Sequence, residues 1–107
     1  RDFTYVDDVV EGYIRASLSE KAIGQTINLG TGEEHAIKDV VLKVLELMGH
    51  PVRPLIGALP YRPREIWRLY TDSSKARELL GWKPQVSLEA GLRKTIEWYT
   101  EKFKAGA

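Results

Sequence analysis

Hydrophobic residues near the start of the chain follow first a strand-like and then a helical pattern. The β-rich run FTYV at residues 3–6 predicts a short strand. Asp8 followed by Glu11 has the spacing of a capping box, so a helix is predicted at about residues 9–18. The first unit of the chain is therefore interpreted as a strand followed by a helix.

The same order of elements recurs further along the chain. The segment QTINLG predicts a second strand, which the glycine turn GTGEE closes. Apolar residues then recur with helical spacing at Ile37, Val40, Val41, Val44 and Met48. This pattern predicts an amphipathic helix that ends at Gly49.

The second half of the chain begins with a segment that lacks periodicity. Residues 50–65 contain four of the five prolines, which predicts a long irregular loop. IWRLYTD predicts a third short strand, and SSKARELL predicts a helix that Gly81 ends. Ser87 is the predicted cap of a last helix. The apolar face of that helix carries Leu88, Leu92, Ile96, Tyr99 and Phe103.

Together these elements predict an α/β fold with only a few short strands of its own. The 107 residues allow one small domain with a single core. Two or three short strands make a poor independent sheet, so TINL and FTYV are expected to pair outside this chain. Because unpaired strand edges invite another chain, the isolated chain is expected either to form a homodimer through strand edges or to swap elements with a second copy.

Composition narrows the class of protein. The chain is 43% hydrophobic and 29% charged, which is typical of a soluble globular fold, and no apolar run approaches the length of a membrane span. It has no cysteine, which fits a reducing cytoplasm and excludes disulfides and thiolate sites. A formal net charge of +1 argues against a nucleic-acid-binding domain. We therefore expect a cytoplasmic protein with neither nucleic acid nor membrane as a partner.

Arginine is concentrated in one window of the sequence. Between residues 50 and 71 a single acid, Glu65, stands against four arginines, a net charge of about +3. The four are Arg53, Arg62, Arg64 and Arg68. A guanidinium group matches a phosphate or carboxylate at two points, whereas lysine offers a point charge. The pattern favours recognition of a shaped anion; the alternative is that these arginines are solvated or form surface ion pairs.

Other residues that could carry chemistry are predicted to be structural. His35 and His50 are fifteen residues apart without an acidic partner at ligand spacing, so no metal site is expected. Asp7 and Asp8 lie at a strand-to-helix junction, where carboxylates cap helices more often than they form an acid/base pair. No catalytic residue is assigned.

The glycine turn and the tryptophans also receive structural interpretations. GTGEE lacks the G-x-G-x-x-G spacing of a dinucleotide site, and two acids follow where an anion would have to lie. The three tryptophans are expected in the core or along a groove, with Trp82 in LLGWKP filling the space at the last helix pair.

Four stretches in fixed order carry a resemblance that covers nearly the whole chain: RDFTYVDDVVEGYIRA, TINLGTGEEHAIKDVV, YRPREIWRLYTDSSKARELLGWKP and SLEAGLRKTIEWY. Together they resemble the C-terminal portion of extended short-chain dehydrogenase/reductases, the NAD-dependent nucleotide-sugar epimerase/dehydratase family. The resemblance implies that residues 1–107 form one substrate-binding domain, the C-terminal lobe of a Rossmann-type enzyme. The sequence of these stretches is more similar to GDP-mannose 4,6-dehydratases, but UDP- and dTDP-sugar enzymes have similar sequences there. The nucleotide and the sugar are therefore not determined.

The family's cofactor loop and catalytic Tyr-x-x-x-Lys pair are not found in this sequence. None of the five tyrosines has a lysine four places on. The resemblance therefore implies that the N-terminal Rossmann domain is absent, that it is a partner of this lobe, and that NAD or NADP belongs to the parent enzyme. The chain alone is expected to bind no cofactor and to be inactive. The alternative is a non-catalytic module that binds an anion or recruits a partner.

The resemblance implies three substrate-binding residues. Arg1 matches the arginine of the family's RD(F/Y/W) motif and resembles a diphosphate ligand, although the alternative is an unordered terminus. Arg62 in RPRE matches a second diphosphate-binding arginine. Glu65 fills an acidic position that accepts from a ribose hydroxyl or orients Arg62. Arg64 replaces a small residue and is expected to point to water.

One departure from the family concerns helix stability. Ala36 stands where relatives tend to have a Ser or Thr cap, before the helix predicted from Ile37. Losing such a cap costs about 1 kcal/mol, so the first turn of this helix is expected to fray.

Overall fold

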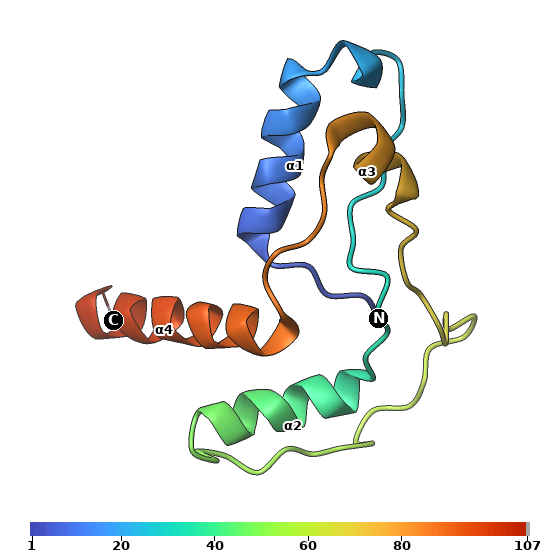
Figure 1. Cartoon of the computed structure of the whole chain (residues 1–107). Helices are drawn as coiled ribbons and strands as arrows, with labels where there is room; N and C mark the ends of the chain where they lie inside the picture. The colour runs from blue at the N-terminus through green and yellow to red at the C-terminus, as the bar shows by residue number, and fades with distance from the viewer. Residues whose placement is uncertain (107) are drawn as a thin grey trace.

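The computed structural model describes residues 1–106, which form four α-helices and one short 3-10 helix joined by extended segments (Figure 1). The elements are α1 (Val6–Leu18), η1 (Glu20–Ala22), α2 (Ile37–Leu47), α3 (Ser74–Leu80) and α4 (Leu88–Gly106). They form two groups: α1 and η1 contact α3, whereas α2 contacts α4. The segments between the helices run from one group to the other (Figure 1).

The predicted strands are absent from residues 1–106, so the α/β prediction was wrong in this respect. The stretches FTYV, TINL and IWRLYTD follow non-helical paths until a helix begins, but they form no ladder. Side-chain oxygens accept several backbone N–H hydrogen bonds that a neighbouring strand would otherwise accept. Gly30 N donates to Ser73 Oγ at 2.9 Å, and Thr71 N donates to an Asp2 carboxylate oxygen at 3.0 Å. High β-propensity without a paired neighbour does not make a strand.

The start of α1 also differs from the prediction. The helix begins at Val6 rather than Val9, its N-cap residue is Tyr5, and no side chain caps it. Asp7 and Asp8 lie inside the first turn, so the capping-box prediction was wrong. A carboxylate in the first turn still complements the helix dipole.

The Asp8 carboxylate instead joins α1 to the segment that precedes α4. It is buried, with 5% relative exposure, and accepts from Gln85 N at 3.1 Å and from Val86 N at 3.0 Å. The backbone oxygen of Asp8 accepts from Trp82 Nε1 at 2.7 Å. Trp82 is 1% exposed, which confirms the prediction that it is buried, and its hydrogen bond places it against α1.

Helices α2, α3 and α4 were predicted correctly from their periodicity and end signals. Ala36 is the N-cap residue of α2 and makes no side-chain cap hydrogen bond, because alanine has no polar side-chain atom. Gly81 ends α3 with φ 62°, the left-handed conformation that favours glycine. Ser87 Oγ accepts from Ala90 N at 3.2 Å at the start of α4.

Few side chains are fully enclosed. The buried hydrophobic residues are Ala76 and Trp82 in one helical group and Leu45 in the other. The accessible surface is 8561 Å², against about 6,100 Å² for a compact protein of this mass. The radius of gyration is 16.9 Å, against about 13 Å for a compact chain of this length. The two helical groups are therefore held mainly by hydrogen-bonded connections rather than by one shared core.

Candidate functional site

The three residues that the family resemblance selected lie together in the structure. Arg1 Nη2 is 3.1 Å from Glu65 Oε1, and Arg62 Nε is 3.6 Å from Glu65 Oε2. Arg1 Nη1 also donates to the carbonyl oxygen of Ile66 at 2.6 Å. Arg1 is thus brought to a carboxylate 64 positions further along the chain, which Arg62 also contacts, and we call Arg1, Arg62 and Glu65 the arginine–glutamate cluster.

The two arginines of this cluster differ in how firmly they are held. The side chain of Arg1 is 30% exposed and that of Glu65 is 18% exposed, so this pair is half-buried. The side chain of Arg62 is 85% exposed and makes only the longer contact to Glu65. Arg62 therefore keeps most of its five N–H donors available to an incoming anion. Arg1 anchors the loop, and Arg62 is the arginine that reaches solvent.

The backbone of Arg1 is fixed against the segment before α2. Arg1 N donates to His35 O at 2.8 Å, and His35 N donates to Arg1 O at 2.8 Å. This ordered pairing differs from the unordered terminus that the sequence left open as an alternative. The guanidinium group of Arg1 is consequently aimed at the loop from a defined position.

Asp2 completes this arrangement, and the sequence interpretation missed it. Its carboxylate accepts from Thr31 N at 3.0 Å, Gly32 N at 2.8 Å, Thr71 N at 3.0 Å and the Thr31 hydroxyl. Partial burial alone would raise the pKa of Asp2, but the hydrogen bonds from Thr31, Gly32 and Thr71 outweigh it and lower the pKa below 3.8. Asp2 remains ionised, and its carboxylate joins the segment at residues 31–32 to Thr71 next to Arg1. Its place in the RD(F/Y/W) motif was the one signal, but its hydrogen-bond partners could not be predicted because they all lie far along the chain.

The remaining arginines of the 50–71 window do not join the cluster. Arg64 is exposed and has φ 63°, in agreement with the expectation that it points to water. Arg68 pairs with Glu34, and this ion pair lowers the pKa of Glu34 and raises that of Arg68. Counting charge along the sequence therefore overestimated the positive group, because the partner of Arg68 lies outside the window.

The charge of the cluster makes it suited to an anionic ligand. Two guanidinium groups share one carboxylate, which leaves a net positive charge and several free N–H donors. Guanidinium groups bind phosphate oxygens in two-point geometry, and these charge-assisted hydrogen bonds are stronger than neutral ones. The shared carboxylate of Glu65 brings the two guanidinium groups to the same part of the loop.

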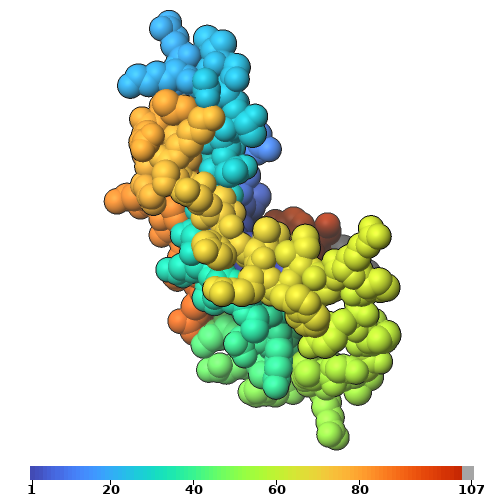
Figure 2. Space-filling view, turned by 90° about the vertical axis from the view of Figure 1, so that its right-hand side faces the viewer, coloured from blue at the N-terminus to red at the C-terminus, as the bar shows by residue number. Residues whose placement is uncertain are grey.

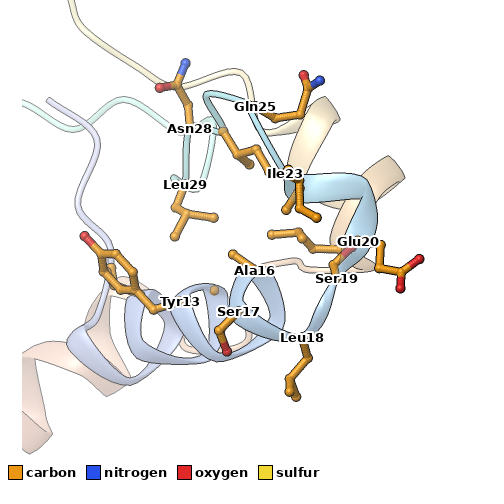
Figure 3. Close-up of a pocket in the computed structure, with 15 residues that line it drawn as sticks. Tyr13, Ala16, Ser17, Leu18, Ser19, Glu20, Ile23, Gln25, Asn28 and Leu29 are labelled. Atoms are coloured by element: carbon orange, nitrogen blue, oxygen red, sulfur yellow. The ribbon is translucent and has the colours of Figure 1, made fainter.

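Two hollows of the described surface lie elsewhere and have different chemistry. One, with a volume of about 610 Å³, lies between α1 and the extended segment around Ile27 (Figure 3). Leu29 and Ala16 contribute apolar walls, and Glu20 is the single charged residue among those that line it. A second, of about 660 Å³, separates the segment Phe3–Asp7 from α4. Neither offers a cation to bind an anion, so neither is the candidate site.

The glycine turn GTGEE does not fit a dinucleotide phosphate. Its backbone N–H groups already have partners, since Gly30 N donates to Ser73 and the next two residues donate to Asp2. A Cβ on Gly30 would lie 2.3 Å from Thr71 Cβ, so this glycine permits close packing of two segments. Within residues 1–106, no group of three or more metal-ligating side chains occurs. None of the described helices has the length and apolar character of a membrane span.

An exposed aromatic pair adjoins the cluster. The rings of Tyr61 and Trp67 meet edge to face, with centroids 4.5 Å apart. Trp67 is 66% exposed, so the expectation of a core or groove position was wrong for this residue. The sequence contained a signal that was overlooked, because the two aromatic residues bracket the RPREI stretch that carries the site.

Comparison with known proteins defines the class. The family model described as GDP-mannose 4,6 dehydratase matches residues 1–95. UDP-glucose 4-epimerase of Mycolicibacterium smegmatis is 37% identical over 102 residues, which cover 95% of this chain and 32% of that protein. The chain therefore belongs to the GDP-mannose 4,6 dehydratase family of NAD-dependent nucleotide-sugar epimerases and dehydratases, which are extended short-chain dehydrogenase/reductases.

Solved structures agree with this assignment. The Thermotoga maritima UDP-glucose 4-epimerase, determined with UDP-glucose, superposes with a TM-score of 0.83 at 33% identity, covering 96% of this chain and 32% of that one. The Bordetella bronchiseptica enzyme WbmF, determined with NAD+ and UDP, gives a TM-score of 0.75 at 33% identity, covering 98% of this chain and 31% of that one. The chain spans about a third of the length of these relatives.

Proposed function

We propose that this chain is the nucleotide-sugar-binding lobe of an NAD-dependent epimerase or dehydratase, and that the arginine–glutamate cluster binds the diphosphate. The observation that carries the proposal is the convergence of Arg1 and Arg62 on Glu65. Arg62, with a side chain that is 85% exposed, binds the diphosphate directly. Glu65 orients it and offers a carboxylate oxygen to a ribose hydroxyl.

Membership of the family supports this assignment of ligand class. Two related structures were determined with UDP-glucose or with UDP, both of which contain the diphosphate that the cluster would bind. A lobe of this kind supplies binding energy from a part of the substrate that does not react. That energy holds the sugar in place for the chemistry, which in the parent enzyme NAD would provide by accepting and returning a hydride.

The residues of this chain take part in binding and positioning. Arg1 is tied to the loop by its contacts with Glu65 and Ile66, so it fixes the loop before substrate arrives. No dinucleotide site is proposed here, because the glycine turn at residues 30–32 has its N–H groups occupied.

The test is a titration of UDP, GDP and dTDP against arginine variants of the full-length protein by calorimetry. Arg62→Ala is expected to weaken binding by about 1.5 to 3 kcal/mol, the range for hydrogen bonds to charged groups. Arg62→Lys should recover little of the loss, because a point charge cannot reproduce two-point contact. Arg64→Ala is the matched control, since Arg64 lies on the same turn without a contact to Glu65.

Two outcomes separate the proposal from a diffuse basic surface. A loss at Arg62 that persists in added salt, beside a small loss at Arg64 that salt removes, supports a specific diphosphate ligand. Equal losses at both arginines would mean that the loop attracts anions only by its charge, and the role of Arg62 would be withdrawn.

A further inference from the structure

The exposed pair of Tyr61 and Trp67 is distinguished by its position, because its two residues flank the arginine–glutamate cluster in the sequence. Tyr61 is 77% exposed and Trp67 is 66% exposed, and their ring planes meet at 66°. Large aromatic rings bury much apolar area when a partner covers them, so leaving two of them exposed on one loop is costly. The space-filling view shows the yellow atoms of residues 60–70 on the surface of the molecule, across the middle of the face (Figure 2). This surface is therefore open to a ligand.

The pair and the arginine–glutamate cluster are built on one turn. Tyr61 and Trp67 stand at its two ends, and Arg62 and Glu65 lie between them. Pro63 restricts the backbone within the turn, and the contact from Arg1 to Ile66 O fixes its second half. The two aromatic residues therefore flank Arg62 within one short, constrained segment of the chain.

We propose that Tyr61 and Trp67 form a stacking platform for the base of the nucleoside diphosphate. This inference rests on the proposed function, because it places the base beside the diphosphate site. In a nucleotide only a ribose separates the base from the phosphates, and here Tyr61 directly precedes Arg62. An edge-to-face pair leaves ring faces free, and every nucleobase has a π-face that stacks on an aromatic side chain.

A stacking platform predicts little discrimination among the bases. Stacking tolerates different bases, because it uses the face of the base rather than its hydrogen-bonding edge. The loop therefore contributes affinity for uridine, thymidine and guanosine diphosphates alike. Choice among them falls to groups that contact the edge of the base.

The experiment compares a ligand with a base to one without, in the full-length protein. UDP and inorganic pyrophosphate are titrated against wild type, Trp67→Ala and Trp67→Phe, with pyrophosphate measured by competition against UDP. Trp67→Ala should raise the Kd of UDP about 5- to 150-fold and leave that of pyrophosphate unchanged. Trp67→Phe keeps an aromatic face and should restore most of the UDP affinity.

A matched control is present on α4. Trp98 and Tyr99 form a second exposed edge-to-face pair, with centroids 4.8 Å apart, and the cation over the Trp98 ring is Lys102 rather than an arginine. Trp98→Ala should leave the Kd of UDP unchanged. A similar loss in this variant would show that removing an exposed tryptophan weakens binding indirectly, and the platform would be rejected.

The outcomes distinguish failure of the platform from failure of the proposed function. If Trp67→Ala leaves UDP binding within twofold while Arg62→Ala weakens it, the diphosphate site stands and the platform is wrong. If Trp67→Ala weakens UDP and pyrophosphate equally and lowers the Tm, the pair packs against protein and supports the loop, which also overturns the platform. If Arg62→Ala has no effect either, both proposals fail.

Discussion

Two regions of this molecule have few buried side chains but differ in how firmly their segments are held together. Around Asp2 and Asp8, carboxylates accept backbone N–H groups from distant segments and lock them together. The region from α2 through residue 70 has one buried hydrophobic side chain, Leu45, and a long exposed loop. The two regions meet where Arg1 contacts Glu65. Hydrogen-bonded cross-links to carboxylates therefore make the first region rigid. The loop that carries the candidate site is anchored to this region through Arg1.

The largest effect is expected at Asp8, the most buried cross-link. Asp8→Ala should reduce the free energy of unfolding by about 3 kcal/mol, because the amides of Gln85 and Val86 lose a charged acceptor. Denaturant unfolding of wild type and variant measures the loss. Asp7→Ala is the control, since Asp7 lies in the same helical turn but is exposed. Equal losses in the two variants would show that the helix dipole, rather than the cross-link, explains the effect.

Asp2 should rank second. Asp2→Ala is expected to reduce the free energy of unfolding by about 2 kcal/mol, because three backbone amides lose their acceptor at a half-buried position. Amide exchange at Thr31, Gly32 and Thr71 should accelerate together in this variant. Acceleration confined to Thr31 and Gly32 would contradict a link between these segments.

The same carboxylate predicts a pH dependence. Because hydrogen bonds lower the pKa of folded Asp2 below 3.8, its contribution to stability is complete above the unfolded pKa and is lost as the pH falls through the folded value. Stability should therefore decline with acid below about pH 4. Asp2→Asn should show a shallower decline in that window. Unfolding measured from pH 6 downward checks this, and parallel profiles would exclude Asp2 as the titrating group.

In the more open region, a gain is expected at the start of α2. Ala36→Ser should stabilise the helix by about 0.5 to 1 kcal/mol, because a hydroxyl can accept from an amide that now has no side-chain cap. Exchange of the Lys38 and Asp39 amides should slow. Ala36→Val, which adds bulk without an acceptor, should not reproduce the gain.

The smallest effect is expected at the exposed ion pair between Arg68 and Glu34. Arg68→Ala should not change the Tm measurably at physiological salt, because exposed ion pairs contribute little and are screened. The pKa of Glu34 should nevertheless rise toward its ordinary value, which an NMR titration detects. A large fall in Tm would show that this pair belongs with the aspartate cross-links.

Local pattern predicted the helices well, because periodicity and end signals act over a few residues. Gly81 and Ser87 marked the end of α3 and the start of α4 as observed. The same reasoning failed at Asp8, since its spacing to Glu11 suits a cap and a helix interior equally. Its true partners lie at Gln85 and Val86, beyond the reach of any local rule.

The strands and the candidate site both depend on contacts between segments that are distant in sequence, which local patterns do not determine. A strand requires a neighbour, so the β-rich segments alone could not determine whether ladders form. The family resemblance did select Arg1, Arg62 and Glu65, which the structure brings together. Their binding role remains a prediction until ligands are measured.

The surplus surface of this fold has a calorimetric consequence. Unfolding a compact domain of this length raises the heat capacity by about 1.3 to 1.6 kcal/mol/K, because apolar groups become hydrated. With 8561 Å² already accessible, these residues have less apolar surface left to expose. Their stability should therefore vary unusually gently with temperature, with a broad and shallow melting transition. The part of the heat-capacity change that another surface restores by covering exposed side chains such as Tyr13, Ile23 and Phe103 would measure how much of this exposed apolar area is used in contact.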